Sequence, residues 1–96
     1  MVKIINRKKY NTETAKEIAY YNNIDGFYIL QCDDVHFFET TLYKKKTGEY
    51  FICNEGNAWS GIKTGIVPVT EEGARHWSEK YLDADEYEEI WGEVEE

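Results

Sequence analysis

Hydrophobic and polar positions alternate most clearly in the middle of the chain. Between residues 37 and 43, Phe38, Thr40 and Leu42 fall on one side of an extended strand, and the residues between them fall on the other. A turn at residues 45–48 follows, where Gly48 can take the positive φ of a tight connection, and a return strand is expected at residues 49–53. The pattern predicts a β-hairpin around which the rest of the chain is organised.

Shorter β-type runs flank this hairpin. Residues 2–5 are β-branched and predict a strand, and residues 66–69 predict an edge strand because Pro68 cannot donate to a ladder. Residues 27–32 are rich in β-forming side chains, but Asp33 and Asp34 interrupt the run before residues 36–38. This region is either one bulged strand or a loop that leads into the hairpin.

Three stretches have helical spacing. Thr12 resembles an N-cap, with Ala15, Ile18 and Ala19 on one narrow face of a helix that ends at residues 22–26. Thr70 is expected to cap a second helix, whose inward residues are Ala74, Trp77 and Tyr81.

A third helix is expected to begin with a capping box formed by Asp83 and Glu86. Its apolar stripe is Tyr87, Ile90, Trp91 and Val94, and Gly92 is the expected terminator.

Together the patterns predict one α+β domain over residues 1–96. We expect a small antiparallel sheet of about three to four strands, with one N-terminal helix and two C-terminal helices packed on it. Hydrophobic residues make up 42% of the chain and aromatic residues 16%, so a few large side chains can build the core.

Charge changes the picture, because the net charge of −8 is unevenly distributed. Residues 70–96 hold eleven acids and two bases, a net charge of −9, whereas residues 1–69 hold eight acids and nine bases, a net charge of +1. An acidic surface repels nucleic acid and favours basic partners. The charge therefore predicts a basic protein surface as partner, such as that of a nucleic-acid-binding effector complex, and makes direct nucleic-acid binding unfavourable.

The sequence also indicates a compartment. No stretch approaches the roughly 18 apolar residues of a membrane helix, and residues 1–6 lack the apolar run of a secretion signal. We therefore expect a cytoplasmic protein with no membrane association. In that compartment Cys32 and Cys53 are expected to act as small hydrophobic residues rather than as a disulfide.

Few residues suggest chemistry. Cys32, His36, Cys53 and His76 are zinc-competent, but their spacing matches no recognised zinc motif, so we expect no metal site. Residues 55–61 fit neither phosphate-loop pattern, and neither serine has the sequence context of a nucleophile. We therefore expect a protein without catalytic residues or cofactors.

The acidic final helix is the main candidate site. Its expected contact residues are Asp85, Glu86, Glu88, Glu89 and Glu93. Carboxylates at i and i+4 advance about 6 Å along the axis, close to two phosphate steps on one DNA strand. The spacing suits imitation of a nucleic-acid backbone, although a solvated face gives the same composition.

A second candidate surface combines a loop and a turn. The loop residues Glu55, Asn57 and Trp59 follow the hairpin, and residues 44–46 form a lysine-rich tip. Such a tip can contact phosphate, but lysines at hairpin tips also serve solubility.

Several segments carry a resemblance to a known family. They are residues 9–15, 39–51, 55–60, 67–74 and 83–92. They resemble a family of small, mostly uncharacterised bacterial proteins carried on phages and other mobile elements. The match covers most of the chain between Tyr10 and Gly92, although Asn57 stands where the family has a second loop glycine, and Gly73 where it has a glutamate.

The resemblance implies a role rather than a reaction. Small acidic proteins of such elements include inhibitors of host defence, among them anti-CRISPR proteins. We therefore expect a non-enzymatic inhibitor that uses its acidic C-terminal helix. The alternative is a structural or regulatory module that contacts nucleic acid or protein through the loop of residues 55–60 and the basic hairpin tip.

Overall fold

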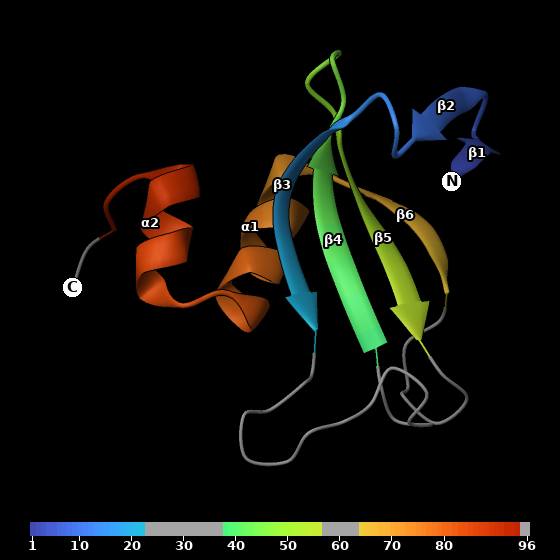
Figure 1. Cartoon of the computed structure of the whole chain (residues 1–96). Coiled ribbons are helices and arrows are strands. Elements are labelled where there is room, and N and C mark those ends of the chain that lie inside the picture. Colours follow the sequence, from blue (N-terminus) through green and yellow to red (C-terminus); the bar gives the residue numbers. More distant parts are fainter. Residues whose placement is uncertain (23–37, 57–63, 95–96) are drawn as a thin grey trace.

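Four antiparallel strands form the main sheet; the first helix lies against one of its faces, and the second helix lies beside the first, past the outer strand (Figure 1). The computed structural model describes residues 1–22, 38–56 and 64–94. Across the main sheet the strand order is β3-β4-β5-β6, and a separate hairpin of β1 and β2 precedes it. The elements are β1 (Val2–Ile5), β2 (Lys8–Asn11), β3 (Lys16–Asn22), β4 (Phe38–Lys44), β5 (Tyr50–Gly56), β6 (Gly65–Val69), α1 (Glu71–Tyr81) and α2 (Ala84–Trp91).

The predicted central hairpin is confirmed, and the structure gives its register. Leu42 pairs with Ile52 across β4 and β5, and the turn closes with a 2.7 Å hydrogen bond from the Lys45 amide to the Glu49 carbonyl. Gly48 has a φ of 94°, which a residue with a side chain rarely adopts. Strand β5 continues to Gly56, past the expected end at residue 53. The expected strand at residues 66–69 is also confirmed, and β6 is an edge strand among the parts of the chain that are described.

Side chains are buried on both faces of the main sheet. The helix-covered face carries a cluster around Leu42, which is fully buried, and the opposite face carries one around Phe51, also fully buried. The buried residues of the first cluster are Leu42, Ala74 and Trp77, and those of the second are Tyr10, Phe51 and Ile66. The β1–β2 hairpin supplies Tyr10 and so covers one end of the second face.

The predicted N-terminal helix is wrong. Residues 16–22 form strand β3, which pairs antiparallel with β4, and the Thr12 region is a turn in which the Glu13 amide donates to Asn11 Oδ1 at 2.9 Å. A register shift between Glu17 and Ala19 makes Ile18 the extra residue of a β-bulge. Ile18 and Ala19 therefore both pack against the helix-side cluster. The bulge broke the alternation expected of a strand and produced a spacing that resembles a helix.

The predicted number of strands is also wrong, because the described residues form six strands in two sheets. The strand at residues 2–5 was expected, but β2 was not, since its lysines hide the alternation. Asn6 and Arg7 have φ values of 50° and 65°, the left-handed conformations of a two-residue hairpin turn. Asparagine tolerates this conformation well, whereas arginine rarely adopts it.

The first C-terminal helix begins where the sequence predicts. Thr70 Oγ1 accepts a 3.0 Å hydrogen bond from the Gly73 amide. A Cβ atom at Gly73 would lie 3.2 Å from Val69 Cβ, so the helix start packs closely on the end of β6. Trp77 is buried, and its indole nitrogen donates to Thr40 Oγ1 at 3.0 Å. This bond fixes α1 on the central strand.

The second C-terminal helix has the predicted capping box, but its apolar stripe is shorter than predicted. Asp83 Oδ1 accepts from the Glu86 amide at 2.9 Å, and Glu86 Oε1 accepts from the Asp83 amide at 3.4 Å. The helix ends at Trp91, and Gly92 follows with a φ of 91°. Val94 therefore lies beyond the helix with 56% of its surface exposed, and it is not part of the packed stripe.

Candidate functional site

Helix α2 is held against α1 and the sheet by one tryptophan. The Trp91 indole nitrogen donates to Ser78 Oγ at 3.0 Å, and Ser78 Oγ donates to the Ala74 carbonyl at 2.9 Å. The Trp91 ring lies 5.6 Å from the Tyr50 ring, and the Arg75 guanidinium lies 4.8 Å from its centroid. These contacts fix the direction in which the acidic residues of α2 point.

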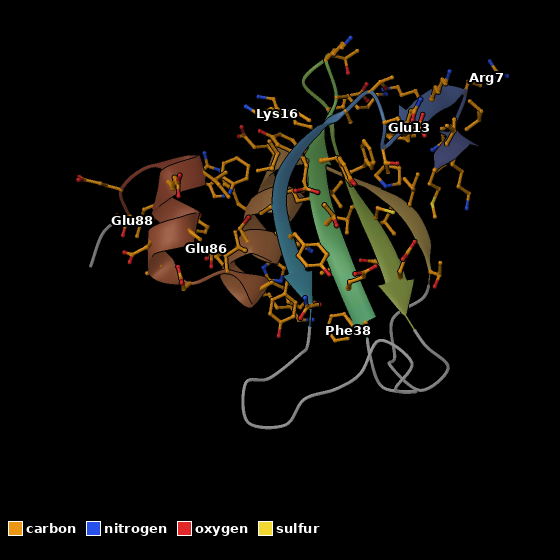
Figure 2. The ribbon with its side chains drawn as sticks, in the orientation of Figure 1. Arg7, Glu13, Lys16, Phe38, Glu86 and Glu88 are labelled. Atoms are coloured by element: carbon orange, nitrogen blue, oxygen red, sulfur yellow. The ribbon has the colours of Figure 1, made fainter. Side chains whose placement is uncertain are left out.

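The five predicted acidic contact residues do not share one face. Glu86 and Glu89 line a groove between α2 and strand β3. Glu88 is half-buried and points away from the sheet, whereas Glu86 points toward it (Figure 2). Asp85 lies exposed in the first turn of α2, and Glu93 lies exposed just beyond its end. A partner on the β3 side therefore meets only part of the predicted set.

The groove between β3 and α2 combines carboxylates with apolar side chains. Its volume is about 410 Å³, and its lining residues are Lys16, Glu17, Ile18, Ala19, Glu86, Glu89 and Ile90. Glu86 and Glu89 of α2 and Lys16 of β3 are therefore its charged side chains, because Glu17 pairs with Tyr43 and points to the other face of the sheet. The β3 residues of this groove were missed because the segment was predicted to be helical. The apolar pair formed by Ile18 and Ala19 is the sequence signal that marks it.

Glu86 has a structural role as well as a place in the groove. Its side chain and backbone both belong to the capping box with Asp83. Replacing it would weaken the start of α2, by about 0.5–2 kcal/mol for a typical cap. Glu89 lines the same groove and has no such capping bond among the described contacts. A substitution at Glu89 therefore tests the groove without weakening the start of the helix.

The structure describes only one of the three predicted loop contact residues. Asn57 and Trp59 lie outside the described residues, but Glu55 lies in β5, directly opposite Glu39 of β4. A hydrogen bond with Glu39 raises the pKa of Glu55, and burial and the Glu39 charge add to the shift. Tyr20 Oη donates to Glu39 Oε2 at 2.5 Å. The two glutamates form an acidic pair that a count of register from the turn at residues 45–48 would have found.

The basic hairpin tip is partly neutralised by Glu49. Lys8 Nζ lies 2.8 Å from Glu49 Oε2, and Lys45 Nζ lies 3.3 Å from Glu49 Oε1. The Lys45 ammonium also lies 4.3 Å from the centroid of the Tyr10 ring. The Lys8 hydrogen bond is the main reason that the pKa of Glu49 falls to about 2, with a further bond from Thr47. Lys45 is therefore engaged within the fold.

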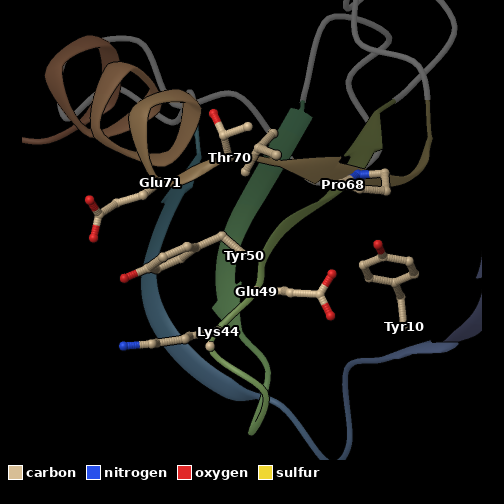
Figure 3. A pocket seen from close by; sticks show the side chains of 9 residues that line it. Tyr10, Lys44, Glu49, Tyr50, Pro68, Thr70 and Glu71 are labelled. Carbon is tan, nitrogen blue, oxygen red and sulfur yellow. The ribbon is translucent and has the colours of Figure 1, made fainter. Parts of the chain in front are cut away.

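A larger hollow of about 550 Å³ opens beside this tip, near the start of α1 (Figure 3). Lys44, Tyr50 and Glu71 extend to one side of β5, and Tyr10 and Glu49 lie on the other (Figure 3). The Lys44 ammonium lies 5.5 Å from the Tyr50 centroid. Positive and negative groups are mixed around this hollow, so its charge favours no ligand class.

The four zinc-competent residues are not brought together as far as they are described. Cys32 and His36 lie outside the described residues. Cys53 packs in the cluster of the β1–β2 side, whereas His76 lies on α1, which covers the other face of the sheet. Burial raises the pKa of the Cys53 thiol. Within residues 1–22, 38–56 and 64–94, no group of three or more His, Cys, Asp or Glu side chains is placed to hold a metal ion.

Comparisons and helix lengths add two findings. No family model, curated protein or solved structure matches the chain. Of the helices in the described parts, none is long and apolar enough to span a membrane.

Proposed function

We propose that this chain is a non-catalytic protein-binding inhibitor that places a basic partner surface against α2 and the groove between β3 and α2. The observation that carries the proposal is the groove, which Glu86 and Glu89 line together with Lys16 and the apolar residues Ile18, Ala19 and Ile90. Helix α2 itself contains no lysine or arginine. A basic side chain entering the groove gains both charge contacts and apolar contact for its stem.

The strength of such an interface depends on several weak pairs. An exposed ion pair contributes about 0.2–1 kcal/mol, so no single glutamate can hold a partner. Several acids on one rigid helix raise the encounter rate with a basic surface and give binding that weakens with salt. Strong salt dependence is therefore an expected property of the complex.

The biological role that we propose is inhibition of a host defence effector, in the manner of an anti-CRISPR protein. Asp85 and Glu89 are spaced i and i+4 on α2, about 6 Å apart along the axis, which suits a groove that normally binds a nucleic-acid backbone. The resemblance to proteins of mobile elements supports this role. Under this proposal the chain competes with nucleic acid for a basic protein surface.

A matched pair of double variants tests the interface. Asp85→Lys/Glu89→Lys reverses two charges on α2, and Glu13→Lys/Glu72→Lys makes the same change in charge elsewhere. All four residues are exposed, and Asp85 and Glu72 both lie in the first turn of a helix. The cost to helix stability is therefore similar in the two variants.

The assay is affinity purification from a host that carries candidate defence complexes, followed by titration of the isolated partner. We expect the α2 variant to bind the partner at least about tenfold more weakly than wild type, because two attractions become repulsions. The control variant should bind as wild type does, and both should show the wild-type circular dichroism spectrum. Equal losses in both variants, or no loss in either, would refute the α2 interface.

A further inference from the structure

Lysines from two segments that are distant in the sequence line one hollow beside the tip of the β4–β5 hairpin. Lys9 comes from β2, and Lys45 and Lys46 come from the turn between β4 and β5. The hollow has a volume of about 180 Å³, and its lining residues are Lys9, Asn11, Thr14, Ala15, Lys45, Lys46 and Thr47. None of these lining residues is acidic.

The walls of the hollow are fixed by hydrogen bonds. On one side, the Ala15 amide donates to the Asn11 carbonyl at 3.1 Å. On the other, the Gly48 amide donates to the Lys45 carbonyl at 2.9 Å. The contact of Lys8 with Glu49 ties the two sides together at 2.8 Å. The backbone of both walls is therefore set by the fold, and the Lys8–Glu49 ion pair links them.

The gathering of ammonium groups opposes the charge of the protein. The chain carries a net charge of −8, and only eleven of its residues are lysine or arginine. Glu49 balances Lys8 and contacts Lys45, but Lys9 and Lys46 are exposed and have no carboxylate partner among the described ion pairs. Lysines that serve solubility alone would be expected to spread apart, since like charges repel.

Polar groups beside the lysines complete the donor set. Asn11 lines the hollow, and its Oδ1 already accepts from the Glu13 amide, which leaves the Nδ2 hydrogens as its side-chain donors. The Lys45 ammonium contacts Glu49 Oε1 and the Tyr10 ring, and its third hydrogen can still donate. The Thr14 and Thr47 hydroxyls also line the hollow, but they already donate to the Asn11 carbonyl and to Glu49 Oε1. The available donors are therefore the lysine ammonium groups and the Asn11 amide, and such donors suit an oxyanion.

We propose that this hollow binds a phosphoryl group through Lys9, Lys45, Lys46 and Asn11. Its volume is several times the roughly 30 Å³ share of one water and lies below the roughly 300–1,000 Å³ of pockets that enclose a whole small ligand. It therefore fits one tetrahedral oxyanion with its waters. The phosphoryl group has two possible sources, a free phosphate or phosphomonoester and the backbone of a nucleic acid. The site is independent of the α2 interface.

The test uses inorganic phosphate, thymidine monophosphate and a ten-residue oligothymidylate as probes. Each is titrated into the full chain at low ionic strength, with amide shifts in residues 9–15 and 45–47 as the readout, and with chloride and thymidine as controls. Lys9→Gln/Lys46→Gln removes two charges from the hollow. Lys3→Gln/Lys80→Gln makes the same change at two exposed lysines that do not line it.

We expect saturable shifts with phosphate and none with chloride or thymidine. Binding should weaken at least about fivefold in the Lys9/Lys46 variant and less than about twofold in the Lys3/Lys80 variant. Oligothymidylate that binds at least tenfold more tightly than phosphate, with the same dependence on Lys9 and Lys46, would identify nucleic acid as the source. Equal affinities per phosphate would identify the free anion or a phosphomonoester.

Two results would overturn the site: equal shifts from phosphate and chloride, or equal losses in the two variants. The Asp85→Lys/Glu89→Lys variant separates this proposal from the α2 interface. It should bind phosphate at least as tightly as wild type does, whatever the outcome of the partner titration. A phosphate affinity that falls together with partner binding in that variant would contradict a separate site.

Discussion

The buried hydrogen bond between Trp77 and Thr40 should be worth a measurable part of the stability of the fold. Thr40→Val keeps the shape of the side chain and leaves the indole N–H without its acceptor, in a site where Thr40 is 2% and Trp77 is 5% exposed. An unsatisfied buried donor costs about 1–3 kcal/mol, and the added methyl group returns up to about 0.8 kcal/mol. We expect a net loss of about 1–2 kcal/mol, or roughly 5–15 °C in melting temperature.

Thermal and urea unfolding followed by circular dichroism measure this loss. Thr41→Val is the matched control, because Thr41 lies on the same strand and points to the opposite face. It should change the free energy of unfolding by less than about 0.5 kcal/mol. On a Trp77→Phe background, Thr40→Val should cost almost nothing, so the double-mutant cycle should give a coupling of about 1–2 kcal/mol. Additive losses, or a Thr40→Val protein as stable as Thr41→Val, would refute the reasoning.

Three further charge changes have predicted signs. Glu49→Gln should lower the melting temperature above pH 4.5 and make no difference near pH 2. The reason is that Lys8 holds the folded-state pKa of Glu49 at about 2, against an ordinary value of 4.5. A change in melting temperature that is independent of pH would contradict this role of Lys8. Glu55→Gln should stabilise by about 0.2–1 kcal/mol at pH 7 and not below about pH 4. The hydrogen bond with Glu39, burial and the Glu39 charge all raise the pKa of Glu55, so the fold favours a neutral side chain at this position; melting curves at both pH values decide. Lys16→Glu removes the like charge opposite Lys44, so it should raise the melting temperature. It also removes the positive charge from the groove, so it should raise the partner affinity about threefold. A weaker complex in titration would count against the groove as the binding site.

Local signals predicted the parts of the fold that depend on neighbouring residues. The turn at Gly48, the Thr70 cap and the Asp83–Glu86 capping box are each set by a few adjacent positions, and all three are confirmed. Strand β3 was missed because its nature depends on β4, more than fifteen residues further along, and because the bulge at Ile18 hides the alternation. A strand that pairs only with distant residues has no complete local signature.

The candidate site was predicted in composition but not in arrangement. The sequence identified the acidic residues of α2, but it could not show that Glu89 faces β3 while Glu88 faces away. That division depends on Trp91, whose bond to Ser78 fixes the rotation of α2. The meeting of Lys9 with the hairpin tip likewise depends on how the β1–β2 hairpin packs, which periodicity does not encode.

Competition with nucleic acid tests the central claim most directly. A purified basic effector is bound to a labelled duplex, the chain is added at increasing concentration, and the free duplex is measured by gel shift. We predict release of the duplex by wild type and by Glu13→Lys/Glu72→Lys, with at least about tenfold more Asp85→Lys/Glu89→Lys required for the same release. Two results would contradict the claim that the acidic surface occupies the basic surface of its partner. One is equal release of the duplex by all three proteins. The other is a band that migrates more slowly in the gel and contains effector, duplex and chain together.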